Sequence, residues 1–304
     1  MFYASRLPAL SVPSWLITRP ELDDEGNTRP HFARDRDRIL YSRPFRRLSG
    51  KTQVFLPYSH DYVRTRLTHT LEVAQIARDI CEYLRFDVAL AEAVAFGHDL
   101  GHTPFGHVGE RGLNHLMNGC PIVGFNRPMS DEHSGFKHNL QSCKVAQTLS
   151  RLYSGKGGLN LTNFTYWGMA NHTATTWGKC DCWERSKRCR LSLSPEACCN
   201  NSGQTSVGYY DKYVKMGKLP ENLTTEQNRK NEKSQAWSFE GLVVRAADTI
   251  AQRHHDLEDA LVTRIMEPKE VVEVLSSKFA SLIADNAAYE QDRLYLKAMR
   301  EFAD

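Results

Sequence analysis

The chain has 304 residues, with 39 Lys and Arg against 36 Asp and Glu, so its formal charge at pH 7 is +3. Hydrophobic residues make up 41% and charged residues 25%, which is typical of a globular protein and excludes disordered and collagen-like chains. No apolar run approaches the length of about 18 residues that a membrane helix needs. Pro8 and Pro13 break the N-terminal segment, which therefore makes a poor signal peptide. We expect a cytoplasmic protein without a membrane partner.

Helices dominate the predicted elements in the first half of the chain. The first 30 residues are rich in proline and polar residues, which is typical of an irregular arm. Between 66 and 84 apolar residues recur every three or four positions, as on one face of a helix. Gly101 and Pro104 end the nearly continuous apolar run that precedes them. We predict helices at 35–48, 66–84, 89–98, 110–117 and 137–152, with a loop at 118–135.

The second half of the chain changes character between 154 and 231, where Gly, Asn, Ser, Thr, Cys and Lys are frequent and periodicity is weak. An insertion with short helices is expected there. A long helix follows at 238–262, and one or two more are expected within 271–302. The predicted fold class is mainly α. The predicted layout is an arm at 1–34, a core from 35–153 and 232–265, an irregular Cys-rich insertion at 154–231, and C-terminal helices at 266–304.

Histidines and aspartates form the main chemical signal. Six of the 12 histidines lie between His98 and His138. Adjacent His98 and Asp99 at a helix end offer one nitrogen and one oxygen ligand, and His69 and Asp248 offer one more of each. Such a mixed set suits a divalent Mn, Fe or Zn ion with open coordination positions. A single histidine on a helix is more often a hydrogen-bonded core residue than a metal ligand. The metal hypothesis therefore depends on the joint occurrence of His69, the His98-Asp99 pair and Asp248.

The 238–262 helix carries two expected stripes. One is polar and could meet a metal and a phosphate, although a solvent-facing stripe would look similar. It consists of Arg245, Asp248, Gln252, Asp256 and Asp259. The other is apolar and is expected to face the core. It consists of Phe239, Leu242, Val243, Ala246, Ile250 and Leu257.

Two further patterns are less specific. Arginines concentrated between 34 and 66 suit phosphate binding, or else a solvated helix face. Five of the eight cysteines lie between Cys180 and Cys199, without the paired CxxC spacing of a zinc ribbon. We expect free thiols there, with a structural zinc site as the alternative.

Together the motifs resemble the HD-domain metal-dependent phosphohydrolases, and the fuller pattern is similar to the dGTPase-like deoxynucleoside triphosphate triphosphohydrolases. HDLGHTPFGHVGE is the most specific motif. The matching stretches are RPFRRLSGKTQVF (43–55), DYVRTRLTHTLEVAQIAR (61–78), EAVAFGHDLGHTPFGHVGE (92–110), FKHNLQS (136–142), GLNLT (158–162) and VVRAADTIAQRHHDLEDA (243–260). The implied fold is an HD-domain helical bundle.

The resemblance also implies site residues. One divalent metal ion per site (Mn, Mg, Fe or Zn) would be held by His69, His98, Asp99 and Asp248. The catalytic turn would comprise His102, His107 and Glu110. Substrate would be bound by Gln53, Arg66, His138 and Asp256. The sequence departs from the family at Gln252, where a substrate-stacking Tyr is usual, and at Asp304, beyond which members usually continue.

The implied activity is hydrolysis of a deoxynucleoside triphosphate to deoxynucleoside and inorganic tripolyphosphate. His107 with Glu110 would handle protons, His102 would stabilise developing charge, and Arg66 would hold the triphosphate. We expect a homo-oligomer. One alternative is another HD enzyme: a nucleotidase, a cyclic-nucleotide phosphodiesterase or a (p)ppGpp hydrolase. The other is a degenerate HD protein that binds nucleotides or single-stranded nucleic acid.

Overall fold

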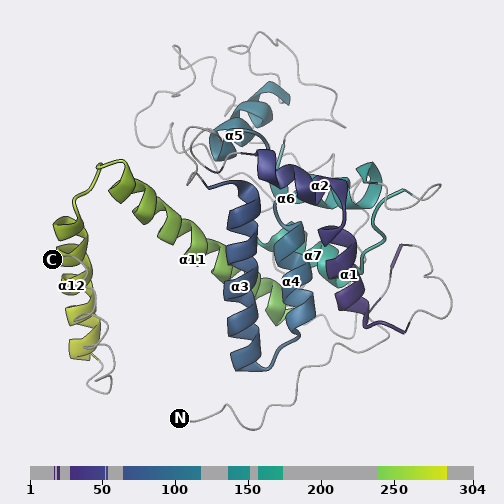
Figure 1. Ribbon diagram of the computed structural model, residues 1–304. Helices are drawn as coiled ribbons and strands as arrows, with labels where there is room; N and C mark the ends of the chain where they lie inside the picture. Colours follow the sequence, from purple (N-terminus) through teal and green to yellow (C-terminus); the bar gives the residue numbers. More distant parts are fainter. Residues whose placement is uncertain are drawn as a thin grey trace, which may run out of the picture. The chain divides into compact units, whose positions relative to one another are not determined.

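The computed structural model describes residues 17, 19–20, 28–51, 53, 64–117, 136–150, 157–173 and 238–285. All regular elements among them are helices, which confirms the mainly α fold class (Figure 1). The chain divides into two compact units, Met1–Thr249 and Ile250–Asp304. None of the described helices is both long and apolar enough to cross a membrane.

The first helical segment is divided, whereas the sequence predicted one helix over 35–48. Helix α1 (His31–Leu40) is followed by α2 (Arg43–Arg46) and a 3-10 turn, η2 (Arg47–Gly50). The division falls at Ser42, whose Oγ accepts a hydrogen bond from the Phe45 amide at 3.3 Å and so begins a new helix. Because α1 begins at His31, the predicted arm at 1–34 extends too far.

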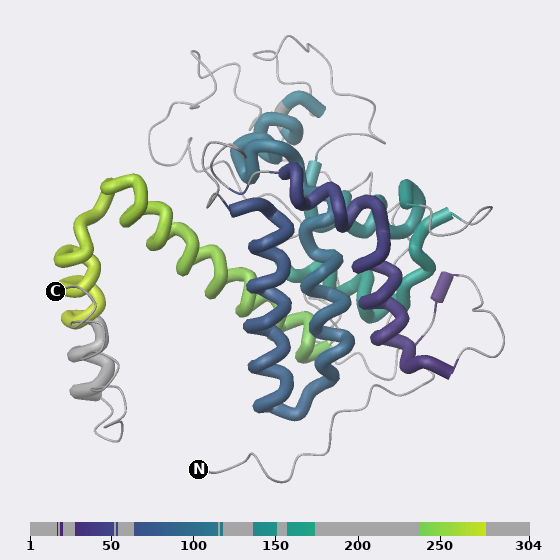
Figure 2. Tube along the Cα trace, in the orientation of Figure 1, coloured from purple at the N-terminus to yellow at the C-terminus, as the bar shows by residue number. Residues whose placement is uncertain are grey.

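Helices α3 (Arg66–Leu84) and α4 (Val88–Gly97) lie side by side at the centre of the first unit (Figures 1 and 2). The hydroxyls of Thr65 and Thr68 form a capping box that begins α3. Asp87 caps α4 by accepting a hydrogen bond from the Leu90 amide at 2.9 Å. These helices match the predicted segments 66–84 and 89–98 to within one residue.

The remaining helices of the first unit are α5 (Gly106–Met117), α6 (His138–Lys144) with a π turn at its end (η5, Val145–Leu149), and α7 (Asn163–Asn171). Helix α7, of 9 residues, lies inside the predicted insertion at 154–231, where the sequence allowed short helices. Tyr166 and Met169 of α7 pack in the same core cluster as Leu140 and Ile39. The Cys-rich segment 180–199 lies outside the described residues.

Asp35 fixes the start of α7. Its Oδ2 accepts hydrogen bonds from the Thr162 amide at 2.9 Å, the Thr162 hydroxyl at 2.6 Å and the Thr165 hydroxyl at 2.7 Å. All three groups are buried, so α1 and α7 are joined by a satisfied polar network inside the core.

Two helices end the described chain, α11 (Phe239–Val262) and α12 (Pro268–Asp285). The apolar stripe expected on α11 is largely wrong, since Phe239 is 58% and Ile250 49% exposed. The buried apolar residues of the helix are Val243, Val244, Ala247 and Ala251. Apolar residues occur on more than one face of α11, so periodicity alone selected the wrong face.

Candidate active site

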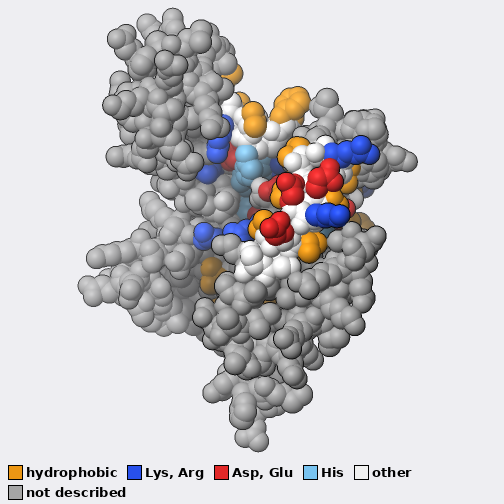
Figure 3. All heavy atoms as spheres, turned by 90° about the vertical axis from the view of Figure 1, so that its left-hand side faces the viewer, with side chains coloured by type: hydrophobic (Ala, Val, Ile, Leu, Met, Phe, Trp, Pro, Cys, Tyr) orange, Lys and Arg blue, Asp and Glu red, His pale blue; other side chains and the backbone are white. Residues whose placement is uncertain are grey.

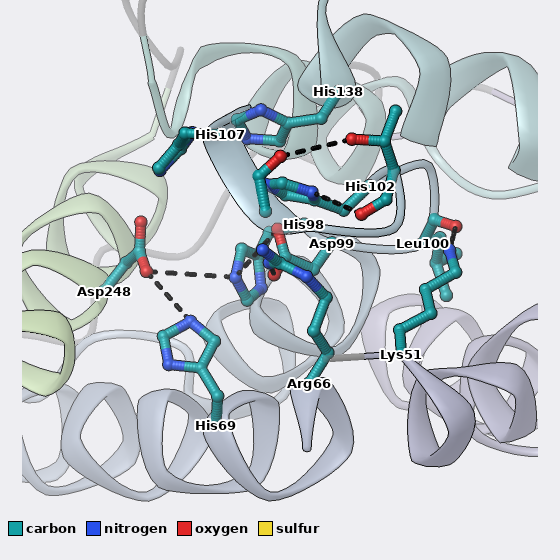
Figure 4. Close-up of polar contacts among 12 residues, drawn as sticks. Lys51, Arg66, His69, His98, Asp99, Leu100, His102, His107, His138 and Asp248 are labelled. Carbon is teal, nitrogen blue, oxygen red and sulfur yellow. Dashed lines mark hydrogen bonds and ion pairs between the residues drawn. The ribbon is translucent and has the colours of Figure 1, made fainter. Parts of the chain in front are cut away.

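His69, His98 and Asp99 meet where the first turn of α3 faces the C-terminal end of α4 (Figure 4). His98 caps α4 at its C-terminus, and its Nδ1 lies 2.6 Å from the Ala95 carbonyl oxygen. A carbonyl only accepts hydrogen bonds, so Nδ1 carries the proton and Nε2 keeps a lone pair for a ligand.

Asp248 of α11 completes this group. Its Oδ1 lies 3.1 Å from His69 Nε2 and 4.0 Å from His98 Nε2, and Asp99 Oδ1 lies 3.5 Å from His98 Nε2. Burial favours protonation of Asp248, but the hydrogen bond with His69 outweighs it and holds the pKa of Asp248 well below its usual range. The structure thus brings together the four side chains that the sequence predicted as metal ligands.

The chemistry of this donor set fits a divalent cation. The donor atoms of His69, His98 and Asp99 lie within 4.8 Å of one another. Among the described residues, the buried Nε2 of His98 has no hydrogen-bond partner. A buried lone pair beside two carboxylates calls for a cation, and mixed nitrogen and oxygen ligands suit Mn, Fe or Zn. The assignment of these residues as ligands stays a prediction.

Arg66, which the sequence suggested as a substrate contact, is buried and forms an ion pair with Asp99. Burial acts to raise the pKa of Asp99, but His98 and Arg66 hold it well below the ordinary value. Nearby, Lys51 Nζ donates a hydrogen bond to the Leu100 carbonyl at 3.1 Å, and burial lowers the pKa of Lys51 to about 8. The site is therefore rich in positive charge as well as in potential ligands.

The predicted catalytic turn forms a second group around Glu110, which is 1% exposed. Glu110 Oε2 lies 3.1 Å from His107 Nδ1, and Oε1 lies 2.9 Å from both Nδ1 and the amide nitrogen of His138. Burial opposes ionisation, but the hydrogen bonds from His107 and His138 hold the pKa of Glu110 well below its usual range. An ionised Glu110 therefore orients two imidazoles at once.

His102 lies against this group, with its ring stacked on that of His138 at a centroid distance of 4.5 Å. Its Nδ1 lies 3.2 Å from the Thr103 carbonyl oxygen, while its buried Nε2 has no hydrogen-bond partner within the described part of the chain. Burial lowers the pKa of His102 well below the ordinary value, so the ring is neutral. An anion placed at Nε2 would favour its protonation.

The catalytic turn is open to solvent on one side. The His107 side chain is 54% exposed and that of Asp248 23%, whereas Glu110 between the histidines is covered. Histidine side chains are visible at the surface in Figure 3, bordered by basic and acidic side chains. A dissolved substrate can therefore approach His107.

For the other two predicted substrate contacts, Gln53 and Asp256, the structure gives fewer interactions. Gln53 lies near the turn, because its carbonyl oxygen would be 3.1 Å from a Cβ added to Gly106. Its buried Oε1 has no hydrogen-bond partner among the residues described. Asp256 belongs to the second unit, where it is exposed. Its role in substrate binding stays a prediction.

Sequence reasoning missed His172, which follows α7. Its Nε2 lies 3.2 Å from His138 Nε2, and its ring centroid lies 5.0 Å from that of His98. The residue falls in the stretch taken for an irregular insertion. The signal that could have found it is GLNLT at 158–162, one of the motifs of the resemblance, which immediately precedes the helix that His172 caps.

Comparison with known proteins agrees with this arrangement. A family model for the HD domain matches residues 66–152. A deoxyguanosinetriphosphate triphosphohydrolase-like protein of Roseobacter denitrificans is 35% identical over 290 residues, which cover 95% of this chain and 59% of the relative. Proteins with the same name from Caulobacter sp. (35% over 274 residues; 90% and 57%) and Brucella ovis (46% over 176 residues; 58% and 40%) are also similar.

The chain spans between 40% and 59% of the length of these curated relatives. The matched HD domain contains His69, His98 and Asp99, together with the turn that carries His107 and Glu110. Residues 66–152 of the chain therefore match the HD domain, and the chain is similar in sequence to deoxyguanosinetriphosphate triphosphohydrolase-like proteins.

Proposed function

We propose that this protein is a metal-dependent phosphohydrolase that converts a deoxynucleoside triphosphate, with dGTP as one candidate, to deoxynucleoside and inorganic tripolyphosphate. The observation that carries the proposal is the convergence of two groups at one place. His69, His98, Asp99 and Asp248 surround a buried lone pair, and beside them Glu110 orients His107 and His138. The names of the relatives support the nucleotide class of substrate.

The four converging side chains would hold one divalent ion, with Mn, Mg, Fe and Zn as candidates. When bound, such an ion supplies Lewis acidity toward phosphoryl oxygens and lowers the pKa of a bound water. Arg66 contributes by holding Asp99 through its guanidinium.

His107 is the residue placed to move a proton. Glu110 accepts from its Nδ1, so the partly exposed Nε2 is the free position of the ring. In the proposed reaction, water attacks the α-phosphorus and releases one proton to solvent, while the bond from phosphorus to the 5′-oxygen breaks. The leaving 5′-oxygen needs a proton, and His107 in its imidazolium form can deliver it from Nε2.

His102 and the basic groups would bind the triphosphate. A phosphate oxygen at His102 Nε2 favours protonation of that nitrogen, which then donates a hydrogen bond to the anion. Gln53, Arg66, His138 and Asp256 remain the proposed substrate-binding residues, and Lys51 adds positive charge beside them. We further propose that the protein acts in the cytoplasm as a homo-oligomer and that single-stranded nucleic acid is a second partner.

Product identity tests the proposal. The purified protein is incubated with each of the four dNTPs and with Mn²⁺ or Mg²⁺, and the products are separated by anion-exchange chromatography. Deoxynucleoside and tripolyphosphate in equal amounts are expected, and Asp248→Asn should form neither. Release of orthophosphate or pyrophosphate would identify a different HD hydrolase. Nucleotide binding without any product would identify a binding protein.

A further inference from the structure

We propose that His172 is a positioning residue that holds His138 in place through a hydrogen bond between their Nε2 atoms. The kinetic part of this inference rests on the proposed phosphohydrolase function, whereas the contact itself does not. His172 is 2% exposed and lies behind His138 in the core, so it touches no dissolved substrate and acts through its neighbour.

The hydrogen bonds form one chain with fixed acceptors at both ends. At one end the Met169 carbonyl oxygen lies 2.7 Å from His172 Nδ1, and at the other the Glu110 carboxylate lies 2.9 Å from His138 Nδ1. Carbonyl and carboxylate oxygens only accept, so both Nδ1 atoms carry protons. The two Nε2 atoms, 3.2 Å apart, then need one further proton between them, since two lone pairs would repel.

This chain explains why His138 has a single orientation. One nitrogen is held by Glu110 and the other by His172, while the flat face of the ring supports His102 at a centroid distance of 4.5 Å. Removal of His172 would leave the buried Nε2 of His138 without its partner. His138 could then turn, and both Glu110 and His102 would lose the neighbour against which they are placed.

A second metal ion is the competing explanation, because donor atoms of Asp99, His138 and His172 lie within 4.8 Å of one another. The geometry supports the hydrogen bond, since the two Nε2 atoms lie 3.2 Å apart in hydrogen-bonding geometry. Metal content must therefore be measured on every variant. An ion lost together with His172 would overturn the positioning role.

Two amide variants separate the two ring nitrogens. His172→Gln places an acceptor oxygen near the former Nε2, whereas His172→Asn reaches only the position of Nδ1. We expect His172→Asn to lower kcat/KM by about 10–100-fold with metal content unchanged, and His172→Gln to restore most of kcat/KM. Tyr166→Phe is the matched control, because it removes another buried hydrogen bond of α7 at 3.2 Å without touching a histidine. It should lower Tm but leave kcat/KM unchanged.

A double-mutant cycle tests whether His172 acts through His138. In a His138→Ala background, His172→Asn should cost no further activity, because its only route to the reaction is already removed. An additional loss of similar size in both backgrounds would show a general structural role and overturn the proposal.

A spectroscopic experiment tests the contact between His172 and His138 without any measurement of activity. In protein labelled with ¹⁵N-histidine and loaded with Mg²⁺, the His138 ring should show protons at both nitrogens. The Nε2 proton should disappear in His172→Asn and persist in His172→Gln. If the wild-type protein hydrolyses no dNTP but shows these signals, the proposed function fails and the contact stands. If the signals are the same in all three proteins, the contact is wrong whatever the activity.

Discussion

The guanidinium of Arg66 forms an ion pair with Oδ2 of Asp99, and this leaves Oδ1 of Asp99 on the side of His98 Nε2, 3.5 Å away. Arg66 is the first residue of α3, and Asp99 lies in the turn after α4. The pair therefore links the two central helices at the point where the proposed metal ligands meet. It also gives Arg66 a role in the site before any substrate binds.

Loss of the guanidinium should weaken metal binding. In Arg66→Gln, Asp99 loses the partner that orients its carboxylate, so affinity for Mn²⁺ should fall by about 10–100-fold, as is usual for groups that orient a ligand. Calorimetric titration measures this directly. Arg64→Gln is the control, since Arg64 pairs with the more exposed Glu72 at 3.6 Å. Tighter Mn²⁺ binding by Arg66→Gln would mean that its positive charge opposes the ion more than its contact helps.

The ligand assignment itself is tested by His98→Ala and Asp99→Ala. Each removes one of four donors and disturbs the adjacent one, so both should lose bound metal together with activity. Elemental analysis after dialysis measures the metal content. His254→Ala, at an exposed position of the second unit, should retain the wild-type content. Full metal content in either site variant would remove that residue from the ligand set.

Glu110→Gln should separate chemistry from binding. Glu110 is not among the proposed ligands, but it orients His107 and His138. We expect unchanged metal content and retained dNTP binding, with turnover reduced by about 10²–10⁴-fold, the range of an acid-base contribution. Glu92→Gln is the matched control, because Glu92 is also buried but pairs with Arg36 and Arg78. Near-normal turnover of Glu110→Gln would exclude the carboxylate from the mechanism.

The sequence predicts the elements that have one buried face and a clear beginning. Helix α3 starts at Arg66 and ends at Leu84 as expected, because apolar residues recur on one side and Thr65 caps it. The sequence allowed short helices near α7 but gave it no bounds, because α7 is buried on all sides and its residues show no periodicity. The division of the first helix at Ser42 depends on one side-chain hydrogen bond, which periodicity does not show.

The site, too, could be predicted from the sequence only in part. Motif spacing predicted one shared site for four residues, and the structure places their side chains together. They are His69, His98, Asp99 and Asp248. What spacing could not give is the set of partners: that Arg66 pairs with Asp99, or that His172 meets His138. Such contacts depend on how α3, α4, α6 and α7 pack, and no local pattern encodes them.

Gly101 is expected to be essential for packing of the turn that carries Asp99. A Cβ at this position would lie 2.2 Å from the Ser142 amide nitrogen, and that backbone cannot easily move because the Ser142 hydroxyl also donates to the His98 carbonyl at 2.7 Å. Gly101→Ala should therefore lower Tm markedly and reduce activity. Gly112→Ala on α5 is the control, since a Cβ there meets nothing within 4 Å. It should be neutral or stabilising by up to about 1 kcal/mol, the helix preference of Ala over Gly. Equal effects of both changes would contradict the steric argument.

His172 should make the metal-free protein less stable as the pH falls from about 6.5 toward 4.5. Burial, with the neighbouring His98, lowers the pKa of His172 from its ordinary 6.5 to about 3 in the folded protein. Between these values the unfolded chain takes up a proton that the folded chain does not, so the free energy of unfolding decreases as the pH is lowered. One such group contributes a slope of at most about 1.4 kcal/mol per pH unit.

In His172→Gln this contribution is absent, so its stability should depend less on pH across this window. Carboxylates such as Glu110 change the stability mainly at pH values below their ordinary pKa of 4.5. They are present in both the wild type and His172→Gln, so they do not account for a difference between the two. Urea unfolding at several pH values measures the difference, with His254→Gln at an exposed position expected to follow the wild type. Parallel stability curves for the wild type and His172→Gln would show that His172 is not held neutral in the folded protein.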